Sequence, residues 1–194
     1  MILNVVEHYL EPHRYYHTFE HITNMLRNVS LFKQELSDKE LFLLKLAVLY
    51  HDVIFVIGNP NNEEESAQLF LSHAAQGLIV DEKFKLNQAD VDLVARMIRD
   101  TQKHFPSFDL SKYLIDLDLW TLAGDEEFHV NGKKINQEFQ SINPDDYKKG
   151  RIAWLQGMLD RDTIFYTEYC IKLGFNAKAK ANLSSELEAA LKTV

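Results

Sequence analysis

The chain has 194 residues and a formal net charge of -8 at pH 7, with 46% hydrophobic and 26% charged residues. This composition is typical of a globular protein, and the length suits one domain with a sizeable core. The acidic balance excludes a broad basic surface for nucleic acid, and no apolar run is long enough to span a membrane. The single cysteine, Cys170, excludes both a disulfide framework and a zinc site built on CxxC. The first residues do not resemble a secretory signal, so we expect one cytoplasmic domain, residues 1–194.

The predicted elements are all helices, because apolar residues recur at helical spacing and turn residues are scarce, with 7 Gly and 4 Pro. A short helix covers about the first ten residues. Pro12, at a first-turn position, predicts a second helix over about residues 12–34. Ser37 and Glu40 form a capping box for a third, strongly apolar helix. Further helices are predicted, in chain order, over about 62–76, 87–104, 110–123, 144–159 and 175–194. The last of these is expected to be peripheral.

Two adjacent polar residues, His51 and Asp52, interrupt the apolar segment LFLLKLAVLYHDVIFVI. An ionised carboxylate in such a segment costs several kcal/mol unless positive charge or several donors compensate it. Asp52 also lies late in its predicted helix, where the macrodipole disfavours negative charge. A metal ion is the economical explanation. The alternative is that the pair lies at a helix end and binds a nearby arginine.

A second polar pair stands in LIDLDLW, where two aspartates two places apart face nearly opposite ways on a helix. Asp116 lies four places after Lys112 and is expected to be its solvated partner. Asp118 has apolar neighbours at helical spacing, and we predict it as a metal ligand. The alternative is that both aspartates are surface charges.

Three histidines, His13, His17 and His21, stand four places apart and are predicted to share one face of the helix over residues 12–34, with Arg14 beside them. The three histidines are expected to lie at the border of the core-facing side of this helix and not within it.

Two further residues lean toward the core side of their predicted helices. Glu63 does so among three adjacent glutamates, and His104 lies on the apolar side of the helix over 87–104. A lone histidine in such a place is more often a core residue than a ligand.

Together, one histidine, the adjacent His-Asp pair and a later aspartate form a mixed ligand set on three helices. Imidazole and carboxylate ligands suit Mn, Fe, Co, Ni or Zn, and a carboxylate-rich site also admits Mg. A water bound to such an ion has a lowered pKa and can act as the nucleophile in phosphoryl transfer.

These residues follow the order H…HD…D, and the chain resembles the HD-domain metal-dependent phosphohydrolases. The segments RYYHTFEHITNML, LAVLYHDVIF, NEEESAQLF, LIDLDLWTLAG and DDYKKGRIAWLQGMLDRDTIFYT look like successive blocks of a subgroup of predicted metal-dependent HD phosphohydrolases, over about residues 9–170. The resemblance implies a single-domain, all-helical bundle with metal ligands at His21, His51, Asp52 and Asp118. Asp52 would also orient the attacking water.

The same resemblance suggests roles for neighbouring residues. Arg14 would bind the substrate phosphate, and His17 would donate a proton to the leaving oxygen, unless His17 is a supporting or surface residue. Glu63 is a further catalytic candidate and His104 a further phosphate-binding candidate. The additional histidines of two-metal relatives are not plainly present, which favours one divalent metal ion.

We therefore expect a phosphohydrolase that cleaves a small phosphate ester, with nucleotides among the candidate substrates, by attack of metal-activated water. Nucleic acid and membranes are not expected as partners, and a homo-oligomer is compatible with the sequence. The main alternative is a non-catalytic module of the same fold that binds a metal or a nucleotide and has a signalling role. A di-iron oxygenase would need more histidine ligands.

Overall fold

A computed structural model describes residues 2–192, with side chains from residue 5 onward. Every regular element in this range is helical and none is a strand, which confirms the predicted all-α class. The chain divides into two compact units, Met1–Asp118 and Leu119–Val194. That both units act as one domain therefore stays a prediction. Within residues 2–192, none of the helices has the length and apolar character needed to cross a bilayer.

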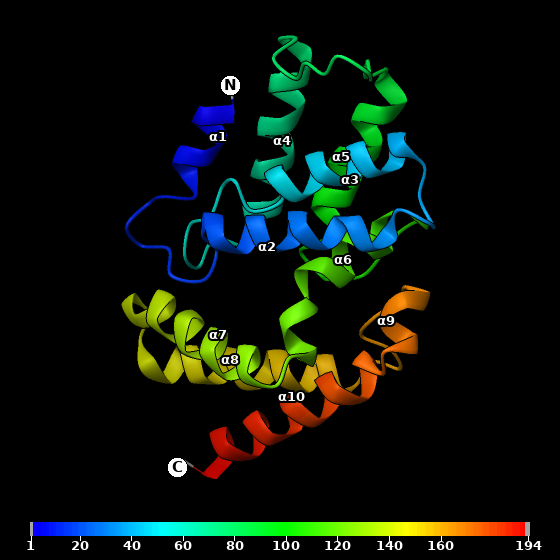
Figure 1. Cartoon of the computed structure of the whole chain (residues 1–194). Helices are drawn as coiled ribbons and strands as arrows, with labels where there is room; N and C mark the ends of the chain where they lie inside the picture. Colours follow the sequence, from blue (N-terminus) through cyan, green and yellow to red (C-terminus); the bar gives the residue numbers. More distant parts are fainter. Residues whose placement is uncertain (1, 193–194) are drawn as a thin grey trace. The chain divides into compact units, whose positions relative to one another are not determined.

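The first unit is built around one central helix. Its elements are α1 (Ile2–His8), α2 (Phe19–Val29), η1 (Ser30–Phe32), α3 (Asp38–Tyr50), α4 (Asn62–Ala75), α5 (Gln88–Asp100) and α6 (Ser111–Asp118). Helix α3 packs against α2, α4, α5 and α6 (Figure 1). Buried side chains such as Leu44 and Ala47 occur on several sides of α3, so it forms much of the core. The predicted capping box of Ser37 and Glu40 begins this helix.

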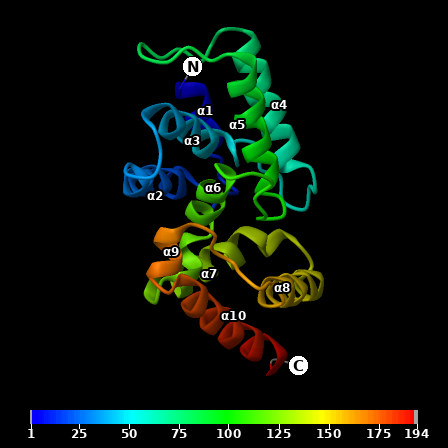
Figure 2. The same ribbon diagram turned by 90° about the vertical axis from the view of Figure 1, so that its right-hand side faces the viewer.

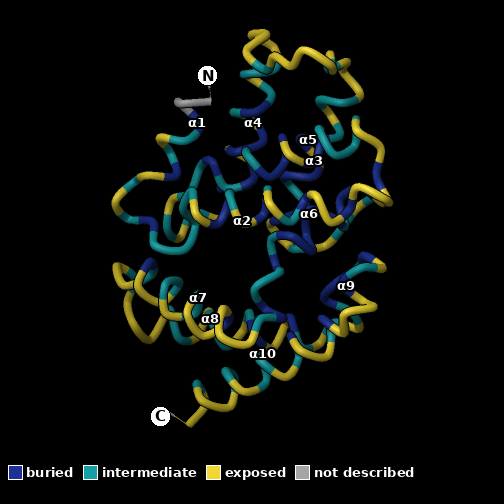
Figure 3. Tube along the Cα trace, viewed as in Figure 1, coloured by how far each residue is buried: buried dark blue, intermediate teal, exposed yellow. Residues whose placement is uncertain are grey.

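The second unit centres on two long helices that pack together. Its elements are η2 (Trp120–Ala123), α7 (Glu126–Glu138), η3 (Phe139–Ser141), α8 (Pro144–Leu159), α9 (Glu168–Lys172) and α10 (Phe175–Lys192). Helix α10 packs against α8, η2 and α9 (Figure 2). Most residues of α8 and α10 are exposed or intermediate (Figure 3), and their few buried residues lie three or four places apart, at helical spacing. The description of the C-terminal helix as peripheral does not fit, because Phe175, Ala179 and Leu183 are buried.

The predicted helix over residues 12–34 is wrong in its first third. Helix α2 begins only at Phe19, after the extended residue Thr18, and the residues from Glu11 to Thr18 form turns and bends. The physical reason is tertiary. The buried Arg14 side chain binds backbone carbonyls of the segment that follows α3, and this arrangement replaces the helical path that Pro12 favours.

Two other elements differ from the expected pattern. The polar stretch after Gly124 forms α7, of which only Phe128 and Glu138 are buried, so its apolar stripe is too thin to predict from sequence. Helix α5 ends at Asp100 instead of continuing to residue 104. The Asp100 carboxylate accepts hydrogen bonds of 2.9 Å from the backbone and hydroxyl of Ser107, which favours a turn after the helix.

Candidate metal centre

Four residues from three helices of the first unit lie together. His21 is on α2, His51 is the C-cap of α3 with Asp52 directly after it, and Asp118 is the last residue of α6. Each offers one ligand atom, and these atoms all lie within 4.8 Å of one another. The structure thus brings together the four residues that the sequence predicted as ligands, although they are spread over almost a hundred positions of the chain. We call His21, His51, Asp52 and Asp118 the metal-ligand group.

The distances between the ligand atoms fit a shared ion. The His21 Nε2 atom lies 3.2 Å from Asp118 Oδ1, and His51 Nε2 lies 2.9 Å from Asp52 Oδ2 and 3.6 Å from Asp118 Oδ1. Metal bonds of about 2.0–2.2 Å place neighbouring ligand atoms roughly 2.8–3.6 Å apart. The four residues therefore have the spacing of a coordination sphere.

The hydrogen bonding of His51 fits a metal ligand better than a structural histidine. Its Nδ1 lies 3.0 Å from the carbonyl oxygen of Val48, which can only accept, so Nδ1 carries the proton. The opposite nitrogen, Nε2, is buried and makes no hydrogen bond with any described residue, although carboxylate oxygens surround it. A neutral His51 would point its lone pair at two carboxylates, which is unfavourable unless a proton or a metal ion lies between them.

The electrostatics of the cluster agree with that geometry. Burial alone would lower the pKa of His51, but the carboxylates of Asp52 and Asp118 outweigh it and hold this pKa well above its usual value. Burial would raise the pKa of Asp118, but the nearby imidazoles of His104, His21 and His51 hold it well below the usual value. The cluster therefore stabilises positive charge at its centre, as a proton or as a metal ion.

The segment after Asp52 is held by Asn62 and Ser66 of α4, two residues that were not identified as functional from the sequence. Asn62 accepts a hydrogen bond from the Val56 amide and donates one to the Val56 carbonyl, at 2.9 and 3.0 Å. Ser66, one turn later, accepts one from the Ile54 amide at 3.0 Å. Both side chains are buried. The available signal was their spacing of four residues on the apolar side of α4.

The prediction that Arg14 binds substrate phosphate does not fit the structure. Its side chain is 0% exposed, and its guanidinium pairs with Glu11 at 2.9 Å. It also donates to the carbonyl oxygens of His17, Asp52 and Val53 at 3.2, 2.7 and 3.0 Å. Four of its five N–H groups are thus engaged inside the protein, and Arg14 holds the backbone of the metal-ligand segment.

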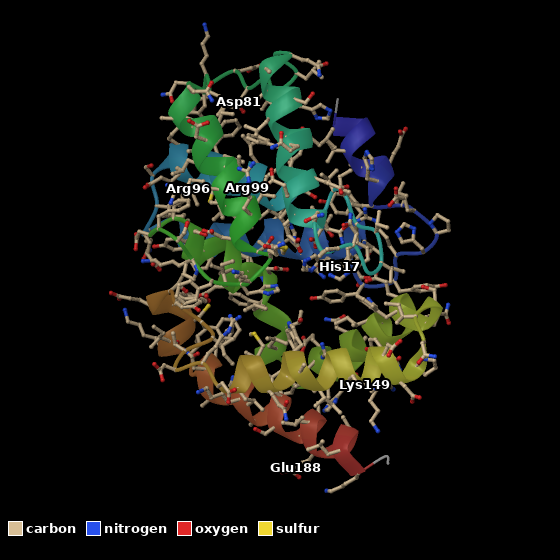
Figure 4. The ribbon with its side chains drawn as sticks, turned by 180° about the vertical axis from the view of Figure 1, so that it is seen from behind. His17, Asp81, Arg96, Arg99, Lys149 and Glu188 are labelled. Carbon is tan, nitrogen blue, oxygen red and sulfur yellow. The ribbon has the colours of Figure 1, made fainter. Side chains whose placement is uncertain are left out.

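His17, labelled in Figure 4, is not on a helix, yet its ring lies beside that of His21. Its ring stacks on Phe55 with centroids 4.2 Å apart and meets the His21 ring edge-on at 6.3 Å. It is near enough to Asp52 to lower the pKa of that carboxyl. The sequence predicted that His17 and His21 share one face of a helix. In the structure a bend before α2 brings His17 next to His21.

Glu63 and His104 also lie near the group. Burial raises the pKa of Glu63, which is on the first turn of α4, and the nearby carboxylates of Asp52 and Asp118 raise it further. The His104 Nε2 atom lies 3.2 Å from Asp118 Oδ2. His104 was predicted to lie on the helix over 87–104, but it follows the end of α5 and has a left-handed backbone conformation with φ 46°.

The prediction for Asp116, the first aspartate of LIDLDLW, was wrong. Asp116 is fully buried instead of solvated, and Lys112 pairs with Asp109 at 2.7 Å. Helix α6 is buried on nearly every side, so facing away from Asp118 does not mean facing water.

Comparisons with protein-family models, with curated proteins and with solved structures find no match. The fold and the site therefore define the class directly: an all-α protein with a buried His/Asp group that could hold a metal ion, an arrangement compatible with an HD domain.

Proposed function

We propose that the chain is a metal-dependent phosphohydrolase of the HD-domain type that cleaves a small phosphate ester. The observation that carries this proposal is the buried Nε2 of His51, which makes no hydrogen bond within the described part of the chain and faces the carboxylates of Asp52 and Asp118. The order of the ligands along the chain, H…HD…D, supports the same family.

A divalent ion held by His21, His51, Asp52 and Asp118 would supply Lewis-acid stabilisation of charge on the phosphoryl oxygens and lower the pKa of water. In the hydrolysis a bond forms between the water oxygen and phosphorus, and the ester P–O bond breaks. The ligand set combines two imidazoles with two carboxylates, which suits Mn, Fe, Co, Ni or Zn and leaves Mg open.

Two residues near the group are suited to move protons. Glu63 is half-buried and has a raised pKa, and as a carboxylate it would accept the proton of the attacking water. His17 is fixed against Phe55 and lies next to His21, and it would donate a proton to the leaving oxygen. His104 would hold Asp118 in position through its 3.2 Å contact.

The proposal is tested by metal analysis of the purified protein, followed by a screen of phosphate monoesters, phosphodiesters and nucleotides with Mn, Co, Ni and Mg. We expect metal-dependent release of phosphate or of a phosphorylated product from at least one substrate class. His51→Ala should abolish this activity. The matched control is His73→Ala, because His73 contacts Tyr50 and no member of the metal-ligand group.

Metal binding without turnover across the whole panel would favour the alternative, a non-catalytic module that binds a metal or nucleotide. Turnover that persists in the His51→Ala protein would contradict the proposed site.

A further inference from the structure

The second unit contains a groove that the proposed phosphohydrolase activity does not use. The groove has a volume of about 620 Å³ and is bordered by α7, α8 and α10. Cavities of roughly 300–1,000 Å³ suit small organic ligands. The residues that define it lie between Phe128 and Ala190, so it belongs wholly to residues 119–194.

Three cationic side chains line this groove against one carboxylate. They are Lys133 on α7 and Lys148 and Arg151 on α8, and the carboxylate is Glu186 on α10. The surplus is local, because the whole chain has 29 acidic and 21 basic residues. The groove is therefore a positively charged place on an acidic protein, which attracts anions.

Several donors in the groove have no partner among the described residues. Lys133 makes no ion pair, and the side chains of His129, Asn136 and Ser185 make no hydrogen bond. Arg151 is held in place by Glu186, which binds its Nε and Nη2 at 2.7 and 3.0 Å, and this leaves Nη1 available. The donors come from three helices and surround one space, as in a site for a multidentate anion.

The groove also has an apolar part. Phe128, Tyr147 and two alanines of α10 line it. Gly132 lines it from α7, and a Cβ atom built at Gly132 would meet nothing within 4 Å. The space beside α7 is thus open and suits a flat or aromatic body attached to the anion.

We propose that this groove binds a phosphate monoester whose body is aromatic or apolar, a class that includes nucleoside monophosphates. The lining has more cationic than anionic side chains, which suits the charge of about -1.5 to -2 on a monoester phosphate at pH 7. Lys133 and Nη1 of Arg151 bind the phosphate, and Phe128 and Tyr147 contact the body.

The experiment is titration calorimetry on the full chain with AMP, phenyl phosphate, adenosine and inorganic phosphate. EDTA is present throughout, so that the metal-ligand group does not contribute. We expect AMP or phenyl phosphate to bind, and adenosine to bind at least tenfold more weakly than AMP. Lys133→Glu should weaken binding at least tenfold. Lys149→Glu is the matched control, since Lys149 is exposed on the same unit but does not line the groove (Figure 4).

A second variant tests the groove without changing charge. Gly132→Leu fills the open space and replaces a helical glycine, so it should fold at least as well as the unmodified chain and weaken binding at least tenfold. Gly150→Leu on α8 is its control, because a Cβ there also meets nothing within 4 Å and Gly150 does not line the groove. The proposal is overturned if neither phosphate ester binds, if adenosine binds as tightly as AMP, or if Lys133→Glu and Gly132→Leu both bind like the unmodified chain. Inorganic phosphate binding as tightly as AMP would overturn the apolar part.

Discussion

Arg14 donates a hydrogen bond of 2.7 Å to the backbone carbonyl oxygen of Asp52. The same guanidinium lies over the rings of Tyr9 and Phe55, at 5.2 and 5.5 Å from their centroids. A buried cation thus fixes the backbone of a residue whose carboxylate belongs to the metal-ligand group. Arg14 acts on the site through Asp52 and not by contact with a substrate.

Arg14→Gln should therefore lower the free energy of unfolding by about 3 kcal/mol, because several buried carbonyls lose their donors and Glu11 loses its nearest cationic partner. Arg14→Lys should restore only part of this stability, since an ammonium group cannot reach the same acceptors with a planar fork. Urea denaturation of the metal-free variants measures the effect. Variants that keep full stability but raise KM would instead support the phosphate-binding role predicted from the sequence.

Asp52→Asn should abolish metal retention while keeping the shape of the side chain. The substitution removes the negative charge closest to His51, at 2.9 Å, and an amide oxygen is a much weaker ligand for these ions. We expect the metal content after dialysis to fall from roughly one ion per chain, as a four-ligand site requires, to near zero. Elemental analysis measures it. Asp109→Asn, on an exposed side chain, is the control and should keep its metal.

Where the fold could be predicted, the information was local. Ser37 and Asn87 both begin helices with capping boxes, as their side chains and the acidic residues three places later indicate. Helix α7 has no comparable stripe or cap and was missed. The start of α2 was misplaced because Arg14 contacts residues 38 and 39 places away, and no short-range pattern contains that contact.

The candidate site follows the same division. His51, Asp52 and Asp118 stand out because each is an ionisable group in an apolar segment, and this local conflict is visible in the sequence. The burial of Arg14 and Asp116 was not visible in the sequence, since it depends on what surrounds their turn or helix in three dimensions.

Removal of the metal should lower the thermal stability of the chain. Ligands from α2, the end of α3 and the end of α6 meet at one point, so an ion there links three helices. Without the ion, the carboxylates of Asp52 and Asp118 repel each other. An ion present at 100 times its Kd stabilises the folded state by about 2.7 kcal/mol. Calorimetry with EDTA and with added Mn, Co or Ni measures the shift in Tm. The Asp52→Asn protein should show no shift; an equal shift in both proteins would mean that the ion binds elsewhere.

Glu63→Gln should lower kcat without loss of metal. Glu63 is near Asp52 and Asp118 but is not one of the four grouped ligands, and its raised pKa suits a proton acceptor. Loss of a general base typically costs about 10²–10⁴-fold in rate. Glu65→Gln is the control, because Glu65 is exposed on the same turn and contacts Asn59. If Glu63→Gln retained full kcat, Glu63 would not be the proton acceptor.

Substitutions at His104 can distinguish the effect of backbone strain from the support that this residue gives to the metal site. Its φ of 46° is unfavourable for a residue with a Cβ, and its Nε2 lies 3.2 Å from Asp118 Oδ2. His104→Gly relieves the strain and His104→Ala does not, so the glycine variant should be more stable than the alanine variant by about 1 kcal/mol. Both lose the contact with Asp118, so both should bind metal about 10–100-fold more weakly. Competition with a chelating dye measures the affinity. Equal metal affinity in the unmodified chain and both variants would show that His104 does not position Asp118, whatever the stabilities.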